Sequence, residues 1–196
     1  MKQLILASGS PRRKQLLETL HTPFVVEVSS FEEIFDETKD PHELAKEMAL
    51  GKASDVAEKH TDAIILAADT FIVLNNEYLG KPKDEEDNIK MLQKLSGKTH
   101  QIVTGFAIVD ADTGKTITRS VESKVTLKPL AKEQIMHYVK EKKPYDKSGG
   151  YAIQEIGDTF VEKIDGDISN IIGLPIDAVK EELIKFNSVT LNKEPL

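Results

Sequence analysis

The sequence contains no cysteine among its 196 residues. Disulfide bonds, thiol nucleophiles and thiolate metal sites are therefore excluded. Long hydrophobic runs are also missing near the start, because the apolar stretch that follows Lys2 ends at Ala7. This stretch is too short for the core of a signal peptide or for a membrane span. We therefore expect a cytoplasmic protein that has no membrane partner.

The chain has no excess of basic residues. It contains 26 lysines and arginines against 33 aspartates and glutamates, which gives a net charge of −7. A nucleic-acid-binding protein needs a basic face, so we expect no nucleic-acid partner. The Walker A, GxGxxG and HExxH motifs are absent, and the five histidines show no metal-ligand spacing. Any site for an anion must gather its positive charge in one place.

No linker, repeat or low-complexity segment divides the sequence, so we expect a single domain over residues 1–196. Predicted strands and helices alternate, and several strand pairs are spaced as hairpins. This order predicts an α/β fold with a mixed sheet flanked by helices. The predicted strands cover residues 3–7, 25–28, 63–74, 101–109 and 116–127, and the predicted helices cover residues 10–20, 40–60, 84–96, 131–142 and 175–186.

Two of these element predictions depend on single residues. The apolar run 63–74 is long for one strand, so we expect the chain to bend or bulge at Asp69. Residues 151–164 contain Gly157 and Asp158 at their centre, and this favours a tight pair of strands. Asn75 and Asn76 are suited to a hairpin turn. We also expect the last ten residues to fray.

Cations lie at the start of the first predicted helix. Ser8 and Gly9 precede Ser10, which suits the N-cap, and Pro11 suits the first helical position. Arg12, Arg13 and Lys14 then stand beside the positive end of the helix dipole, where cations are unfavourable unless an anion joins them. The segment is therefore a candidate phosphate site. An ordinary Ser-Pro cap with solvated arginines is the alternative.

Two further polar residues stand in apolar surroundings. Asp69 interrupts the most apolar run, where it could bond to turn amides or act as a general base or metal ligand. Lys52 falls on the inward face of its helix, four residues from Met48 and from Val56. Its ammonium could snorkel to the rim or could bind a phosphate.

Two loop regions give weaker signals. Lys81 follows Gly80 and precedes Pro82, so its backbone is extended and accessible. The glycine-containing loop 146–151 leads to Gln154, and a plain connection explains this loop as well as a binding role does.

Taken together, these segments resemble the Maf family of nucleotide pyrophosphatases. The resemblance runs nearly end to end, and the segments stand in the order of the family's motifs. They are Leu6 to Arg13, Glu32-Glu33, Lys52-Ala53, Ala68-Asp69-Thr70, Lys81-Pro82, Leu95 to His100, Asp146 to Gly149, Tyr151 to Gln154, and Gly173-Leu174-Pro175.

The resemblance implies a fold like that of inosine triphosphatases, with two lobes around a cleft. It implies hydrolysis of nucleoside triphosphates to the monophosphate and pyrophosphate, with a divalent cation, Mg²⁺ or Mn²⁺. It assigns Asp69 as the proton acceptor for water and as a metal ligand, together with Glu33. It assigns triphosphate binding to Arg13, Lys52 and Lys81. Ser8 and Ser10 of the first motif are also expected to bind the substrate.

The resemblance also carries an expectation about the base. Arg12, Thr70 and Gln154 match the branch of the family that acts on dTTP and UTP. Ser148 and Gly150 depart from the pattern, since alanines are expected there, and so does the segment 167–170. Two alternatives stay open: a low-turnover nucleotide-binding regulator of cell division, and a phosphatase that releases orthophosphate. The sequence also leaves open whether the chain forms a homodimer.

Overall fold

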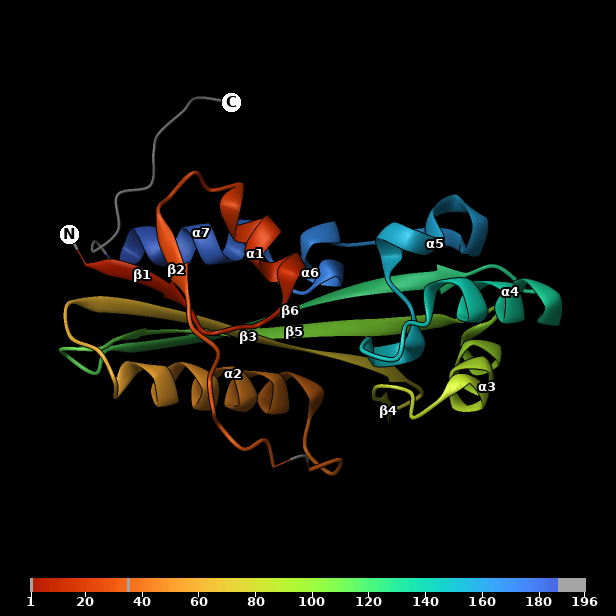
Figure 1. The fold of residues 1–196 in the computed structure, drawn as a ribbon, viewed down its shortest axis with the longest axis horizontal. Coiled ribbons are helices and arrows are strands. Elements are labelled where there is room, and N and C mark those ends of the chain that lie inside the picture. The colour runs from red at the N-terminus through yellow and green to blue at the C-terminus, as the bar shows by residue number, and fades with distance from the viewer. Residues whose placement is uncertain (1, 35, 187–196) are drawn as a thin grey trace. The chain divides into compact units, whose positions relative to one another are not determined.

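The computed structural model describes residues 2–34 and 36–186. Its mixed sheet has seven strands in the order β2-β1-β3-β5-β6-β7, with β4 paired to β3 (Figure 1). The strands are β1 (Gln3–Leu6), β2 (Phe24–Val26), β3 (Ala63–Leu74), β4 (Glu77–Leu79), β5 (Thr99–Asp110), β6 (Thr116–Leu127) and β7 (Val161–Asp165). β1 runs parallel to β2 and β3, whereas β4 and β7 are antiparallel to their partners. The α/β class with a mixed sheet is confirmed.

The chain divides into two compact units. Of the described residues, unit 1 contains 2–34, 36–69, 104–121 and 173–186, and unit 2 contains 70–103 and 122–172. The helices of unit 1 are α1 (Pro11–Glu18), α2 (Pro41–Ala57) and α7 (Ile176–Lys185). Those of unit 2 are α3 (Glu85–Leu95), α4 (Lys132–Lys142), the 3₁₀ turn η1 (Ser148–Gly150), α5 (Ile153–Phe160) and α6 (Ile168–Ile172).

In unit 1, helices cover both faces of the sheet. Alternate residues of a strand point to opposite faces, and here both sets are apolar. Leu4, Leu6 and Ile64 pack with α1 and α7, while Ile5 and Ile65 pack with α2 on the other face (Figure 1). This double coverage explains why β1 and the first half of β3 consist almost entirely of apolar residues.

A close approach of backbone to backbone seats α2 on the sheet. A side chain at Gly105 on β5 would place its Cβ 2.3 Å from the carbonyl carbon of Ala45 on α2. Only glycine allows this contact, so the helix lies directly against the strand. The helix begins where the sequence predicts, because Asp40 caps it by accepting hydrogen bonds from the amides of His42 and Glu43.

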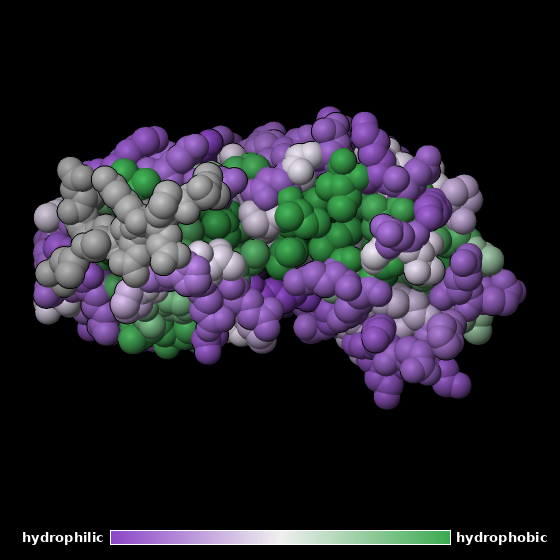
Figure 2. Space-filling view, turned by 90° about the horizontal axis from the view of Figure 1, so that it is seen from above, coloured by the Kyte–Doolittle hydropathy of each residue, from purple (hydrophilic) through white to green (hydrophobic). Residues whose placement is uncertain are grey.

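Unit 2 has its own hydrophobic core. Side chains of α3, α4 and α5 converge there with those of the strands. The buried members include Leu92, Leu95, Ile102, Val125, Ile135, Val139, Ile153, Ile156 and Phe160. Ile164 on β7 and Ile168 on α6 remain exposed, and apolar surface is visible over α6 (Figure 2). No helix in the described part of the chain has the length and apolar character that a membrane span needs.

The strand predicted over 63–74 is confirmed as β3, and its burial is interrupted at Asp69, Thr70 and Phe71. The bend or bulge expected at Asp69 stays a prediction. The pair of strands predicted over 151–164 is wrong in its first half, because residues 153–160 form α5. Gly157 interrupts this helix with φ 40° and ψ −148°, at the predicted turn, and β7 follows from Val161 to Asp165. Ile153, Ile156 and Phe160 are buried in the core of unit 2.

The hairpin prediction is confirmed, because Asn75 and Asn76 both have positive φ between the antiparallel strands β3 and β4. The helix predicted over 84–96 is α3, capped by Asp84, and that over 131–142 is α4. The predicted fraying of the last ten residues falls on residues 187–196, which lie outside the described residues.

Candidate active site

The first part of the site is the start of α1. Ser10 has extended backbone angles, and its hydroxyl accepts a hydrogen bond from the amide of Arg13 at 3.4 Å, as expected for an N-cap. Pro11 opens the helix, and no acidic residue stands in its first turn. The positive end of the helix dipole is therefore not offset by any carboxylate of the helix itself.

Arg13 is fixed by backbone and hydroxyl oxygens. Its Nε donates to the carbonyl oxygen of Gly173 at 2.9 Å, and its Nη1 donates to Oγ of Ser8 at 3.4 Å. Gly173 has a φ of 123°, a conformation that favours glycine and aims this carbonyl. The Ser10 amide also donates to Ser8 Oγ at 3.3 Å. The two serines and Arg13 thus form one hydrogen-bonded group at the helix start.

Burial lowers the pKa of the Arg13 guanidinium, while the charges of Asp69 and Glu33 oppose this shift. The neighbouring charge of Arg12 lowers the pKa further. Arginine keeps its proton in proteins in spite of such shifts. The arrangement therefore holds a desolvated cation within electrostatic reach of two carboxylates.

Lys52 is the centre of the second part of the site. Its ammonium lies 2.7 Å from Oδ1 of Asp69 and 2.8 Å from Oε1 of Glu33. The side chains of Lys52 and Asp69 are only 14% and 13% exposed, whereas that of Glu33 is 52% exposed. Lys52 therefore neither snorkels into solvent nor stands free, since it bridges two carboxylates that come from β3 and from the loop after β2.

The acidic side chains near Lys52 can be compared with the ligands that a divalent cation needs. Among residues 2–34 and 36–186 no three histidine or acidic side chains are grouped as a metal site. Glu33 and Asp69 nevertheless face one cation together, the ammonium of Lys52. Mg²⁺ is commonly held by one or two carboxylates plus the phosphates of a substrate. The two carboxylates fit this kind of binding.

The remaining predicted residues differ in their surroundings. Arg12 is half-buried and belongs to unit 1, where it donates no hydrogen bond to another described residue. Thr70, Lys81 and Gln154 belong to unit 2. Thr70 is half-buried on β3, whereas Lys81 and Gln154 are exposed, on the loop after β4 and in the first turn of α5.

Buried hydrogen bonds anchor the backbone that carries Gln154. His100 Nε2 lies 2.5 Å from the hydroxyl of Tyr151. The amide of Ala152 donates to the hydroxyl of Tyr138 at 3.2 Å, and this hydroxyl donates to Oε2 of Glu155 at 2.9 Å. The sequence analysis missed this role of Tyr138, because a tyrosine on the apolar face of a helix indicates only core packing.

Asn88 explains one departure from the family pattern. Its side-chain amide donates to the carbonyl oxygen of Gly150 at 3.0 Å. A Cβ at Gly150 would lie 1.8 Å from this amide nitrogen, and the φ of Gly150 is 72°. The alanine expected at this position therefore does not fit beside Asn88 in this chain. Gly149 donates in turn to the carbonyl oxygen of Gly80, which precedes Lys81, at 2.9 Å.

Comparisons with known proteins agree with the resemblance. A family model described as Maf-like protein matches residues 3–186. A dTTP/UTP pyrophosphatase of Bacillus cereus is 46% identical over 187 residues, which cover 95% of this chain and 91% of the relative. Proteins of the same name from Bacillus thuringiensis subsp. konkukian and Bacillus cytotoxicus are also 46% identical, over 95% and 96% of this chain and 97% of each relative.

Proposed function

Because the chain belongs to the Maf family, we propose that it hydrolyses dTTP and UTP to the nucleoside monophosphate and pyrophosphate. The observation that carries the mechanism is the contact of Lys52 with both Asp69 and Glu33 at 2.7 and 2.8 Å. This contact brings two carboxylates and an ammonium together, which supports Asp69 as the general base, Glu33 as a second carboxylate and Lys52 as a phosphate-binding cation. We place the reaction in the cytoplasm, where nucleotides are free.

Asp69 takes the proton of the attacking water. As this proton moves to the carboxylate, the water oxygen bonds to the α-phosphorus, and the bond from this phosphorus to the bridging oxygen breaks. Pyrophosphate leaves with the bonding electrons. Lys52 contacts Asp69 through Oδ1, which fixes the direction of the carboxylate. A positioned general base contributes roughly 10²- to 10⁴-fold to a rate.

Cations hold the triphosphate and take up the charge that develops on it. Arg13 is preorganised by Gly173 and Ser8, so little reorganisation is needed when an anion binds. Ser8, Ser10 and the free amides at the start of α1 add neutral donors. Lys52 and Lys81 supply two further charges. The ammonium of Lys52 has three N–H donors, so it can reach a phosphate oxygen while it keeps its contacts with Asp69 and Glu33.

Glu33 and Asp69 would hold Mg²⁺ or Mn²⁺ together with phosphate oxygens of the nucleotide. When bound, the cation neutralises charge on the triphosphate. The preference for dTTP and UTP is assigned to Arg12, Thr70 and Gln154. The amide of Gln154 has both a donor and an acceptor, which suit the N3–H and a carbonyl of uracil or thymine.

The experiment is hydrolysis of dTTP, UTP, CTP and GTP with Mg²⁺ in ¹⁸O-labelled water, with products followed by ³¹P NMR. We expect pyrophosphate as the only inorganic product, the label in the monophosphate, and faster turnover of dTTP and UTP. Label in pyrophosphate would place the attack on the β-phosphorus and remove the proposed geometry. Release of orthophosphate would indicate a phosphatase, and tight binding without turnover would indicate a regulator.

A further inference from the structure

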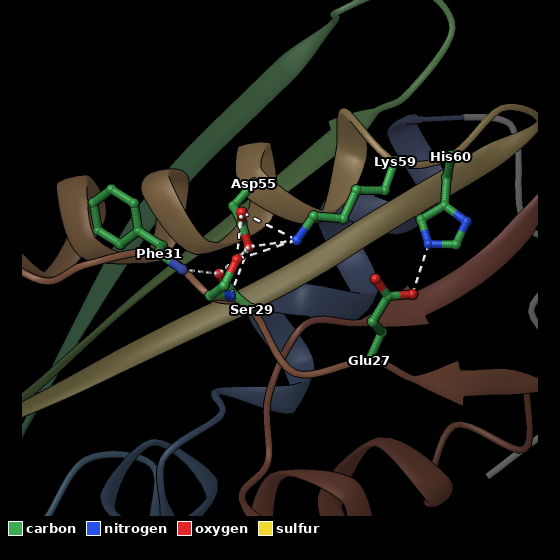
Figure 3. Close-up of polar contacts among 7 residues, drawn as sticks. Glu27, Ser29, Phe31, Asp55, Lys59 and His60 are labelled. Carbon is green, nitrogen blue, oxygen red and sulfur yellow. Dashed lines mark hydrogen bonds and ion pairs between the residues drawn. The ribbon is translucent and has the colours of Figure 1, made fainter.

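The loop that carries Glu33 has no regular secondary structure of its own. It follows β2 and crosses the surface of α2 (Figure 3). Glu33 itself is half-exposed, and Lys52 is its partner at 2.8 Å. An ion pair with an exposed partner contributes little to holding a chain in place. The position of this carboxylate must therefore depend on contacts elsewhere in the loop.

Asp55 on α2 supplies most of these contacts. Its Oδ2 accepts a hydrogen bond from the hydroxyl of Ser29 at 2.7 Å and from the amide of Ser30 at 2.7 Å (Figure 3). Its Oδ1 accepts from the hydroxyl of Ser30 at 3.0 Å and from Nζ of Lys59 at 3.1 Å. The hydrogen bond from Ser29 and those from Ser30 and Lys59 hold the pKa of Asp55 well below its usual range. One carboxylate thus binds both the backbone and the side chains of the loop.

Phe31 adds a second anchor on the same helix. Its amide donates to Oγ of Ser29 at 3.0 Å, within the hydrogen-bonded group around Asp55 (Figure 3). Its ring lies over Gly51, where an added Cβ would come within 2.3 Å of the ring. Glycine inside a helix is less favourable than alanine, and here the absence of a side chain makes room for the ring. Phe31 is two residues from Glu33.

These anchors flank the site along α2. Gly51 and Asp55 are one helical turn apart, and Lys52 stands between them in the sequence. The helix that presents Lys52 to Asp69 therefore also sets the path of the loop that brings Glu33 to Lys52. At its other end, the loop is joined to the segment after the helix by Glu27 and His60, whose atoms Oε2 and Nε2 lie 2.7 Å apart (Figure 3).

We propose that Asp55 is a positioning residue of the active site and that it acts through Glu33. It holds residues 29–31 on α2, so that the Glu33 carboxylate is already beside Asp69 when a nucleotide-bound cation arrives. The inference rests on the proposed function, because it takes Glu33 as a ligand of that cation. Asp55 itself touches neither the substrate nor the cation.

The test is a double-mutant cycle of Asp55→Ala and Glu33→Gln. Mn²⁺ binding is measured by electron paramagnetic resonance with a non-hydrolysable α,β-imido analogue of dUTP. Loss of a residue that orients a ligand typically lowers metal affinity by about 10- to 100-fold, so we expect roughly tenfold weaker Mn²⁺ binding in Asp55→Ala. The double variant should bind Mn²⁺ no more weakly than Glu33→Gln alone. Losses that multiply would show that Asp55 does not act through Glu33 and would overturn the inference.

The control is Glu43→Gln, which removes the ion pair with Lys46 on the same helix and leaves the contacts of residues 29–31 intact. It should leave Mn²⁺ binding unchanged. Asp55→Asn keeps one acceptor oxygen and should restore part of the affinity. If Asp55→Ala does not fold, Gly51→Ala serves in the same cycle, because it displaces the ring of Phe31 while every hydrogen-bonding group remains.

The outcomes separate the inference from its premise. If Glu33→Gln leaves Mn²⁺ binding unchanged, the metal assignment of the proposed function fails. If Glu33→Gln weakens binding and neither Asp55→Ala nor Gly51→Ala does, the positioning role fails alone. Hydrogen exchange supplies a readout independent of the metal: the amides of Ser30 and Phe31 should exchange faster in Asp55→Ala and at the native rate in Glu43→Gln.

Discussion

The two units hold their candidate residues in opposite ways. In unit 1 the functional side chains bind one another, since Lys52 contacts Asp69 and Glu33 and is only 14% exposed. In unit 2 the side chains of Lys81 and Gln154 are exposed, and it is the backbone beneath Gln154 that is fixed, by His100, Tyr138 and others. Fixed charges suit the binding of the triphosphate, which is the same in every nucleotide substrate. An exposed amide on a fixed backbone suits a contact that selects among bases.

The comparison predicts that substitutions in the group formed by Lys52, Asp69 and Glu33 act on turnover. The largest effect is expected for Asp69→Asn, which keeps the size of the side chain and removes the base. Turnover of dTTP should fall at least about a hundredfold, while the affinity for the α,β-imido analogue titrated without a divalent metal changes little. Single-turnover rates and calorimetric titration measure the two quantities separately.

The matched control for this prediction is Asp62→Asn, an exposed aspartate just before the same strand. It should retain the native rate. Native turnover in Asp69→Asn would remove Asp69 from the base role, and a regulator with little turnover would then explain the charged cluster better than an enzyme does.

Local chemistry made part of this molecule predictable. The start of α1 follows from Ser10 and Pro11, and the β3–β4 turn follows from Asn75 and Asn76, because caps and turns depend on a few neighbouring residues. The wrong prediction lies where tertiary packing decides. Residues 153–156 are helical and not a strand, with Ile153 and Ile156 buried in the core of unit 2.

The contacts between site residues could not be predicted in the same way. Lys52 and Asp69 were each recognised as unusual, but their ion pair joins α2 to β3 and exists only when both are packed. Asp55 gives no signal in the sequence, since a single aspartate on the polar side of a helix is typical of ordinary solvent-exposed surface. Gly51 was the available clue, because a glycine inside a helix usually has a packing reason.

Substitutions that disturb the backbone beneath Gln154 in unit 2 should act on base selection instead. Tyr138→Phe removes the hydroxyl that accepts from the buried amide of Ala152 and donates to Glu155. An unsatisfied buried amide is costly, so the first turn of α5 should shift. We expect the preference for dTTP over CTP, measured as the ratio of kcat/KM values, to fall roughly fivefold, which corresponds to about 1 kcal/mol.

The control for Tyr138→Phe is Tyr145→Phe, because the Tyr145 hydroxyl bonds to no other residue of the described chain. It should keep the native ratio. If Tyr138→Phe strongly lowers kcat and leaves the ratio of kcat/KM for dTTP over CTP unchanged, then the backbone beneath Gln154 acts on turnover and not on base selection.

The last prediction concerns the stability of the folded protein in acid. No change in turnover at neutral pH is expected. Burial lowers the pKa of His100 from 6.5 to about 4. Between these two values the unfolded chain takes up a proton at this residue and the folded chain does not, so stability falls as the pH falls. One pKa unit corresponds to about 1.4 kcal/mol, so this histidine lowers the free energy of unfolding by about 3 kcal/mol over this pH range.

Urea unfolding of the native protein and of His100→Gln from pH 7 to pH 4 measures this contribution. The variant keeps a hydrogen-bonding side chain near Tyr151 and should lose stability less steeply over this range. His137→Gln, an exposed histidine on α4, should retain the native slope. If His100→Gln also retains the native dependence of stability on pH, then His100 is already protonated in the folded protein. Unit 2 would then hold its backbone with a charged group, as unit 1 holds its side chains.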